Sequence, residues 1–372
     1  MPLPHGPDPV PEKFAACSVR LGADPEPFRV LDPDGHVVGP LPELDDATLL
    51  ALYRWMAFGR ALDGRALAIQ RQGRLTVWAP ATGQEAALAG MGLAMESGDW
   101  VFTAYREPLL LLMRGLALED LLQYFRGLYW VANPYDTGAW PIQIVIADQT
   151  LHAVGAGLGF RLQGQPHVAV ASVGDGATSQ GDFYEAINFG GVFGAQALIY
   201  IQNNGWAIST PRARQSASQT LAQKALAFGL PGLLVDGNDP LAVYQVARHA
   251  LDRARAGEGP IIVEALTYRL GAHTTADDPT RYQPPDEIAA WRGRDPIIRF
   301  RRFLERRGLW DAGREAVLQA EVLVEIDGAI ARAEARPTPS FDRVIESTWA
   351  IPPPRLRAYQ AARHAIDREE TP

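Results

Sequence analysis

The sequence has 372 residues, 47% of them hydrophobic, and a formal net charge of −8 at pH 7, so we expect a large buried core and no nucleic-acid or anionic-membrane partner. Its single cysteine, Cys17, excludes an internal disulfide and suits a reducing cytoplasm. No apolar run approaches about 20 residues, so the sequence predicts no membrane-spanning segment.

The first 40 residues are expected to form a flexible N-terminal arm followed by a hairpin. The segment MPLPHGPDPVPEKF is rich in proline and lacks the basic and apolar parts of a targeting signal. In FRVLDPDGHVV, the pair Asp34-Gly35 is typical of a tight turn. We therefore expect the main domain to cover residues 41–285.

Two helices are predicted next. Apolar residues between 49 and 57 recur with helical spacing, so a long helix is expected from a cap at Asp45 or Asp46 to about Gln72. The run Thr82-Gly83-Gln84-Glu85 has the pattern of a capping box, which predicts the start of a second helix.

A strand, WVFTA, is predicted to deliver Tyr105 and Arg106 to the edge of a sheet. A guanidinium there can bind phosphate oxygens in a fork, and a tyrosine adds a hydroxyl donor. The plainer interpretation of the pair is a surface turn.

The segment between residues 116 and 163 is predicted as helix, irregular chain and helix. The irregular part, 131–147, ends in QIVIADQ, where the run from Ile144 to Ile146 is also typical of a buried strand. The second helix, 149–163, contains GAGLG, which resembles part of a dinucleotide-binding motif. We reject a nicotinamide oxidoreductase because Phe160 replaces the third glycine and the strand follows the helix.

The stretch from Ala169 to Pro211 is predicted as strand, glycine turn, helix, strand and polar loop. The strand from Ala169 is followed by Gly174-Asp175-Gly176, and Asp182 with Glu185 has the pattern of a capping box at the next helix. The second strand, 197–201, is followed by Asn203-Asn204-Gly205. Both polar segments are therefore expected at carboxyl ends of parallel strands, where open α/β sheets bind ligands.

The residue types in these two segments favour a metal and a phosphate. Asp175 offers a carboxylate oxygen and Asn204 a carbonyl oxygen, which Mg²⁺ binds together with phosphate oxygens. Gly174 and Gly176 allow the backbone to approach a phosphate, and the following helix offers free N–H groups. Either segment alone is usually a turn, but the two occur together with 26 residues (177–202) between them.

The rest of the chain is predicted to complete a doubly wound, mostly parallel α/β sheet with helices on both faces. A short helix at 221–229, a strand at 233–235, a helix from Asp239-Pro240 to about Ala256 and the strand PIIVEALTYRL follow in order. His273 comes directly after this strand. Residues 286–372 are expected to be helical and to pack on the domain or on a partner subunit, and the arginines of RFRRFLERRGLW to be solvated or to face a subunit.

The spacing of GDG and NN resembles the thiamin diphosphate fingerprint. The flanking segments ASVGDGATSQGDFYEAINF, QNNGWAISTP, VDGNDPLAVYQVARHA, GPIIVEALTYRLGAHTTADDPTRY and TGQEAALAGMGLAMESGDWVFTAYRE resemble the α chain of the two-chain 2-oxoacid dehydrogenases in the order of that family. The resemblance covers roughly residues 27 to 350 and is greatest to the pyruvate type of Gram-positive bacteria.

The resemblance implies a thiamin diphosphate-binding fold that uses thiamin diphosphate and Mg²⁺. It places Ile144 and Ile146 at the aminopyrimidine ring through backbone contacts, and it assigns His273 to the diphosphate side as the candidate catalytic residue. The implied metal ligands are Asp175, Asn204 and Trp206. The implied cofactor-binding residues are Tyr105, Arg106, Ile144, Ile146, Gly174, Asp175, Gly176, Ala177, Asn204 and His273.

The resemblance also implies an incomplete site, because the glutamate that activates thiamin belongs to the β chain in this family. We therefore expect an α2β2 heterotetramer that oxidatively decarboxylates pyruvate and passes the acetyl group to lipoamide on a dihydrolipoyl acyltransferase core. The alternatives are branched-chain 2-oxoacids, such as 2-oxoisovalerate, or acetoin as substrate, and a non-catalytic scaffold. For Asp182 and Glu185, the alternative to a capping box is a role in carrying protons between two active sites.

Two departures from the family pattern concern loops. Residues 126–148 contain no histidine and offer Tyr129 and Trp130 instead. Tyr282 is followed by Gln283 where the family commonly has an arginine, so the alternatives are that Arg281 substitutes for it or that the loop is held differently. The loop 273–282 is rich in polar residues, so we expect it to be mobile until cofactor and metal bind.

Overall fold

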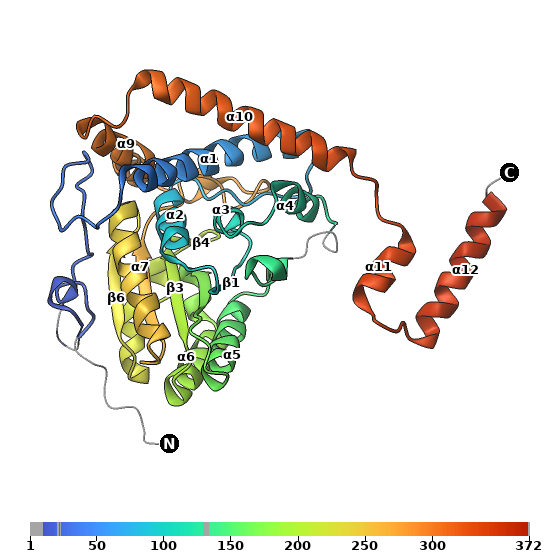
Figure 1. The fold of residues 1–372 in the computed structure, drawn as a ribbon, viewed down its shortest axis with the longest axis horizontal. Helices are drawn as coiled ribbons and strands as arrows, with labels where there is room; N and C mark the ends of the chain where they lie inside the picture. The colour runs from blue at the N-terminus through green and yellow to red at the C-terminus, as the bar shows by residue number, and fades with distance from the viewer. Residues whose placement is uncertain (1–9, 21, 23, 129–133, 371–372) are drawn as a thin grey trace.

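Five parallel strands form the central sheet of the computed structural model, in the order β1-β2-β3-β7-β6 (Figure 1). The strands are β1 Trp100–Phe102, β2 Ala169–Gly174, β3 Ala197–Asn203, β6 Gly232–Asp236 and β7 Ile261–Leu266. Every neighbouring pair is parallel, so the chain crosses over between strands. The structure describes residues 10–20, 22, 24–128 and 134–370.

Different helices cover the two faces of the sheet. α7 Pro240–Arg255, with α2 Glu85–Ala94 against it, covers one face, and α5 Asp148–Leu162, with α6 Gly181–Phe193 against it, covers the other (Figure 1). Since successive side chains of a strand point to opposite faces, Leu198 packs in the first layer and Ile199 in the second. The predicted α/β fold with helices on both faces is confirmed.

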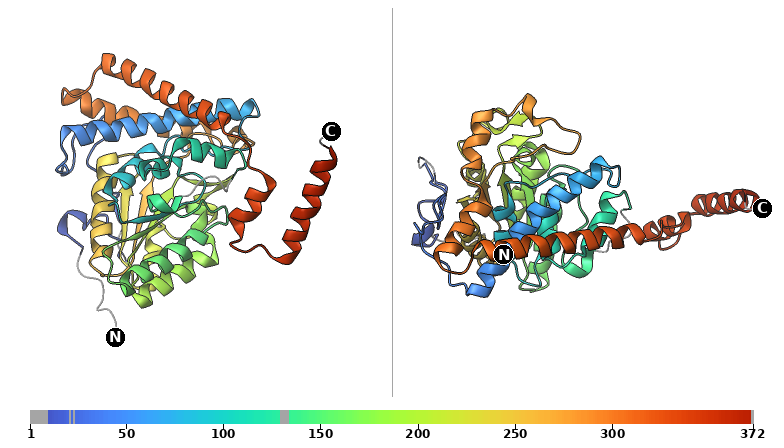
Figure 2. Two further views of the ribbon diagram at one scale, coloured as in Figure 1. Left: turned by 45° about the vertical axis from the view of Figure 1, so that its right-hand side comes forward. Right: turned by 90° about the horizontal axis from the view of Figure 1, so that it is seen from above.

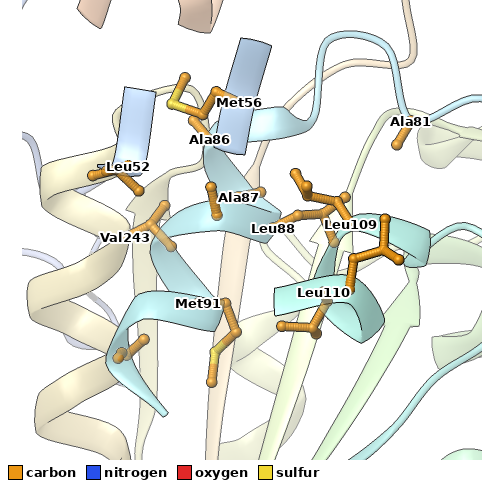
Figure 3. Packing of buried hydrophobic residues seen from close by; sticks show 14 of the residues in the cluster. Leu52, Met56, Ala81, Ala86, Ala87, Leu88, Met91, Leu109, Leu110 and Val243 are labelled. Atoms are coloured by element: carbon orange, nitrogen blue, oxygen red, sulfur yellow. The ribbon is translucent and has the colours of Figure 1, made fainter. Parts of the chain in front are cut away.

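Apart from Glu85 at its start, α2 is apolar around its whole circumference, which is typical of a helix that other elements surround. Figure 3 shows Leu52 and Met56 of α1 Asp46–Arg71, Val243 of α7, and Leu109 and Leu110 of α3 Pro108–Met113 around this helix. The hydroxyl of Tyr200 in β3 also donates to the carbonyl oxygen of Ala87 at 2.8 Å. These contacts fix the first turn of α2 beside the loop that follows β3.

Shorter elements connect these layers. They are α4 Leu118–Phe125, the hairpin strands β4 Trp206–Ala207 and β5 Thr210–Pro211, and 3-10 turns at Glu12–Phe14, Pro134–Thr137, Asp175–Ser179, Arg212–Arg214, Ala222–Phe228 and Pro279–Arg281. The predicted hairpin at Asp34-Gly35 is confirmed by an antiparallel bridge between Leu31 and Val37.

The C-terminal residues are helical, as predicted. They form α8 Pro285–Arg292, α9 Pro296–Arg306, α10 Ala312–Ala335, α11 Phe341–Thr348 and α12 Pro354–Glu370. α10 lies along α1, while α11 and α12 pack on each other and extend away from the rest of the chain (Figures 1 and 2). None of the described helices combines the length and the apolarity that a membrane crossing requires.

One arginine of the C-terminal helices is buried, contrary to the prediction that this group is solvated or faces a subunit. The side chain of Arg299 is 1% exposed and lies 3.1 Å from a carboxylate oxygen of Asp236 and 3.7 Å from one of Asp239. Asp239 also caps α7 by accepting from the backbone N–H groups of Leu241 and Ala242. Two carboxylates thus offset the cost of burying the guanidinium.

Both predicted capping boxes are wrong, although the helices start close to the predicted residues. The N-cap of α2 is Gln84, because the hydroxyl of Thr82 donates to Asp63 at 2.9 Å instead of accepting from the helix. α6 starts at Gly181 after an N-cap at Gln180 that makes no side-chain hydrogen bond. Asp182 and Glu185 are therefore exposed residues inside α6 and form no reciprocal cap.

Candidate functional site

The turn after β2 buries the carboxylate that the sequence singled out. Asp175 is 2% exposed, and its Oδ2 accepts from Nε2 of Gln215 at 3.0 Å. Burial raises the pKa of Asp175 to about 6, while hydrogen bonds from Gln215 and from the backbone N–H of Asn204 act in the opposite direction. A Cβ at Gly176 would lie 2.7 Å from Cβ of Ala207, so only glycine allows the two loops to meet here.

Asn204 follows β3 at the neighbouring strand end, as predicted. Its Oδ1 accepts from the backbone N–H of Trp206 at 3.3 Å, and its Nδ2 donates to Oε1 of Gln84 at 3.1 Å. Asn204 is 5% exposed and Trp206 is 7% exposed. The oxygens of Asp175, Asn204 and Trp206 are therefore on adjacent loops at the carboxyl edge of the sheet.

Tyr105, Arg106 and His273 also come together, from segments 167 residues apart in the sequence. Arg106 donates from Nη2 to Nδ1 of His273 at 2.9 Å and to the His273 carbonyl oxygen at 3.0 Å. The Tyr105 hydroxyl lies 3.5 Å from Nε2 of His273. Because a guanidinium can only donate, Nδ1 of His273 is an acceptor and its ring hydrogen is on Nε2.

Burial and two neighbouring guanidinium groups keep His273 neutral. Burial lowers the pKa of His273 most, and the charges of Arg106 and Arg269 lower it further, to about 4. This corner therefore presents two fixed positive charges and a neutral ring, an arrangement that favours an anion.

One cavity of about 390 Å³ unites the predicted residues. Its lining includes Tyr105, Arg106, Ile146, Gly174, Asp175, Gly176, Ala177, Asn204, Trp206 and His273. Ile144 is the exception among the predicted cofactor-binding residues. It lines a second, mainly apolar cavity of about 740 Å³ that shares Tyr105, Ile146 and His273 with the first.

The alternative interpretation of Ile144 to Ile146 as a buried strand is wrong. No strand forms in this segment of the described chain, and the side chains of Ile144 and Val145 are 60% and 63% exposed. The segment leads into α5 through Ala147, which has a positive φ of 75°. The glycine-rich segment GAGLG lies inside α5, where Gly157 packs on the backbone of Gln196. It is therefore not at a strand-to-helix turn, as a dinucleotide-binding motif would be.

Sequence reasoning missed several side chains that complete the site. Arg269 is fully buried after β7 and donates to the carbonyl oxygens of Trp206 at 3.2 Å and Ile208 at 2.6 Å. It lies four residues before His273, at the end of a predicted strand, where the sequence pattern does not separate a buried arginine from an exposed one. Gln84, Glu107 and Gln202 line the 390 Å³ cavity, whereas Arg269 lies outside that lining, with Nη1 3.4 Å from Nδ1 of His273.

Glu107 is a buried carboxylate next to Arg106. Its Oε1 accepts from Nε2 of Gln202 at 2.9 Å and from the Ser172 hydroxyl at 3.4 Å. Burial raises its pKa to about 7, against the opposing charge of Arg106. Glu107 thus joins the ends of β2 and β3 to the loop that carries Tyr105 and Arg106.

The two departures from the family pattern have different outcomes. Gln283 is 3% exposed and donates to the carbonyl oxygen of Arg269 at 3.0 Å, so it supports the missed arginine directly, whereas Arg281 is exposed. Tyr129 and Trp130 lie outside the described residues.

The donor set fits a hard cation that also binds an anionic ligand. A carboxylate, an amide oxygen and a backbone carbonyl are oxygen ligands of the kind Mg²⁺ takes. Among the described residues, no three His, Cys, Asp or Glu side chains form a metal-binding group, so phosphate oxygens would have to supply further negative charge.

Comparison with known proteins gives a consistent result. Residues 53–342 match the family model described as "Dehydrogenase E1 component". The chain is 45% identical over 314 residues to the pyruvate dehydrogenase E1 component subunit alpha of Staphylococcus epidermidis, covering 83% of this chain and 85% of that one. It is 42% identical over 336 residues to the same-named protein of Staphylococcus aureus, covering 89% and 90% of the two chains.

Proposed function

Since the chain belongs to the family of dehydrogenase E1 components, we propose that it is the α subunit of a pyruvate dehydrogenase. In this role it takes part in oxidative decarboxylation of pyruvate and in transfer of the acetyl group to lipoamide on an acyltransferase core. Relatives with this name match at least 83% of the chain, which supports pyruvate as the substrate.

The cofactor of this proposal is thiamin diphosphate with Mg²⁺. Asp175, Asn204 and the Trp206 carbonyl hold the metal, while Tyr105, Arg106 and His273 bind the diphosphate. The backbone at Gly174, Gly176 and Ala177 borders the phosphates, and the backbone at Ile144 and Ile146 borders the aminopyrimidine. Bound thiamin diphosphate supplies the carbon nucleophile and the electron sink that decarboxylation of a 2-oxoacid requires.

The residues of this chain bind and orient the anionic half of the cofactor. Arg106 lines the cavity and is held by the carbonyl oxygens of Pro80 and His273 before any ligand arrives, so little reorganisation accompanies binding. Neutral His273 keeps a hydrogen on Nε2 and can donate it to a phosphate oxygen or to a reacting group. This is the role we assign to His273 as the catalytic residue.

A β chain completes the site in this proposal. The carboxylates that line the described cavity are Asp175 and Glu107. Asp175 is assigned to the metal, and Glu107 already accepts hydrogen bonds from Gln202 and Ser172. The activating glutamate is therefore assigned to the β chain, within an α2β2 heterotetramer that delivers acetyl groups to a dihydrolipoyl acyltransferase.

The single observation that carries the proposal is the convergence of every predicted site residue except Ile144 on one cavity. Calorimetry on the α–β complex tests it: Asp175→Ala should abolish Mg²⁺-dependent binding of thiamin diphosphate. In a dye-reduction assay with pyruvate, the purified α chain should be inactive until the β chain is added. A wild-type complex that binds no thiamin diphosphate would favour the non-catalytic scaffold.

A second candidate function, as the α subunit of a dehydrogenase for branched-chain 2-oxoacids such as 2-oxoisovalerate, is supported by the 740 Å³ cavity. Its lining is mainly aliphatic and aromatic, including Leu111, Leu121 and Trp140, and it adjoins the first cavity at Ile146 and His273. Such a space accommodates an acyl group larger than acetyl. Values of kcat/KM for pyruvate, 2-oxoisovalerate and acetoin decide between these substrates.

A further inference from the structure

Gln84 lies at the N-cap position of α2 and lines the cavity that contains Asp175 and Asn204. Its side chain is fully buried, with 0% exposure. Its Oε1 accepts from Asn204, but its Nε2 finds no hydrogen-bond partner among the described residues. Since buried polar groups in folded proteins nearly always have a partner, this free donor points to a ligand.

The orientation of both amides follows from one backbone group. The N–H of Trp206 donates to Oδ1 of Asn204, and an N–H cannot accept. Nδ2 of Asn204 must therefore be the donor to Gln84, and Oε1 of Gln84 must be the acceptor. The atom that Gln84 leaves free is consequently the donor Nε2, which suits a negatively charged acceptor.

The backbone around Gln84 is held on both sides, so its side chain is pre-positioned. Glu85 accepts from the N–H of Gly83 at 3.0 Å and pairs with Arg60. The hydroxyl of Thr267, just after β7, donates to the carbonyl oxygen of Gly83 at 2.9 Å. These bonds tie the first turn of α2 to the carboxyl edge of the sheet.

We propose that Gln84 is a positioning and binding residue for the phosphate group of the ligand. Its Oε1 fixes the Asn204 amide so that Oδ1 faces the metal, and its Nε2 donates to an anionic phosphate oxygen in the same cavity. This inference rests on the proposed function, because that function supplies the diphosphate and the metal.

Two variants separate the roles of the two amide atoms. Gln84→Glu keeps an acceptor for Asn204 but replaces the donor with a carboxylate, and Gln84→Met removes both atoms at similar length. Calorimetry on the α–β complex with Mg²⁺ should use thiamin diphosphate and, separately, inorganic diphosphate. At pH 8 we expect Gln84→Glu to bind both ligands at least tenfold more weakly than wild type.

The pH dependence gives a readout that a purely structural role does not produce. A protonated carboxyl group carries a donor again, so the deficit of Gln84→Glu relative to wild type should narrow at pH 6. Gln84→Met should show a deficit that does not change with pH. The matched control is Gln123→Met: Gln123 is 1% exposed and donates to the Ala333 carbonyl oxygen, away from the cavity, so this variant should lose melting temperature but not affinity.

Wild-type affinity of Gln84→Met for both ligands would overturn the inference. If wild type binds inorganic diphosphate but not thiamin diphosphate, the proposed function fails while the Gln84 comparison is still decided on inorganic diphosphate. If wild type binds neither ligand, both proposals are wrong.

Discussion

Arg106 donates to both Nδ1 and the backbone carbonyl of His273, at 2.9 and 3.0 Å. A third bond, from Nη1 to the Pro80 carbonyl oxygen at 2.7 Å, holds the guanidinium plane. The same arginine therefore fixes the tautomer of the histidine, lowers its pKa and contributes positive charge to the cavity.

The first prediction concerns this arginine. Arg106→Lys keeps the charge but loses the planar fork, so we expect at least tenfold weaker binding of thiamin diphosphate, or about 1.4 kcal/mol. Calorimetry on the α–β complex measures it. Arg114→Lys is the control, because Arg114 also binds backbone carbonyls, those of Glu96, Ser97 and Asp99, but does not line the cavity. Equal losses in both variants would contradict a specific role for Arg106.

The second prediction concerns Asp63, which is 5% exposed and accepts from Trp78 and Thr82. Burial raises its pKa to about 7, so its contribution to stability is present below about pH 4 and is lost as pH rises to 7. At about 1.4 kcal/mol for each pH unit between these values, the loss is at most about 4 kcal/mol.

Asp63→Asn keeps an acceptor for Trp78, and the Thr82 hydroxyl can accept from the new amide. Relative to wild type, the variant should therefore gain free energy of unfolding between pH 5 and pH 8, as measured by urea unfolding. Asp45→Asn is the control, because its stability should change with pH in the opposite direction. Hydrogen bonds from Thr48 lower the pKa of Asp45, so this variant should lose stability relative to wild type as pH rises through the Asp45 pKa range. A pH-independent difference for Asp63→Asn would rule out the buried titration.

The sequence was sufficient for features that depend on local pattern. Buried β-branched runs gave the strands, and the polar turns at their ends gave Asp175 and Asn204. It was insufficient where two distant segments compete for one group. Thr82 has the spacing of a cap, yet its hydroxyl binds Asp63, and Arg299 has the spacing of a surface residue, yet Asp236 and Asp239 surround it.

The same limit applies to the site. The contact between Gln84 and Asn204 joins residues 120 positions apart, so no periodicity reveals it. Arg269 was not predicted because an arginine at a strand end has no pattern that separates burial from exposure. Only the packing of α2 and of the loop after β7 against the sheet decides these contacts.

The third prediction concerns the loop 273–282. Asp277 accepts from the His273 N–H at 2.7 Å and from the Tyr282 hydroxyl at 2.5 Å, and Arg269 donates to Tyr282 at 2.7 Å. Arg281 is exposed beside these bonds. Trypsin should cut after Arg281 in the cofactor-free protein, and thiamin diphosphate with Mg²⁺ should slow this cleavage. Mass spectrometry of the fragments over time measures the cleavage rate.

Tyr282→Phe tests the cause of that protection. Without the hydroxyl, Asp277 and Arg269 lose their shared partner, so the cut after Arg281 should become faster in both states. If cofactor leaves the wild-type rate unchanged, the expected ordering of the loop is wrong.

The last prediction concerns Asp182, whose role as a helix cap the structure contradicts. An exposed carboxylate in the first turn of α6 interacts favourably with the helix dipole, by about 0.3–1 kcal/mol. Asp182→Asn removes the charge and the titrating group together. If the dipole is its only partner, the variant should lose less than about 1 kcal/mol of stability and keep its activity.

If Asp182 carries protons between two active sites, pyruvate-dependent dye reduction by the α–β complex should fall while the melting temperature stays near wild type. Glu185→Gln, one turn further along the same helix, should then reproduce the loss of activity, whereas full activity of both variants would exclude the relay.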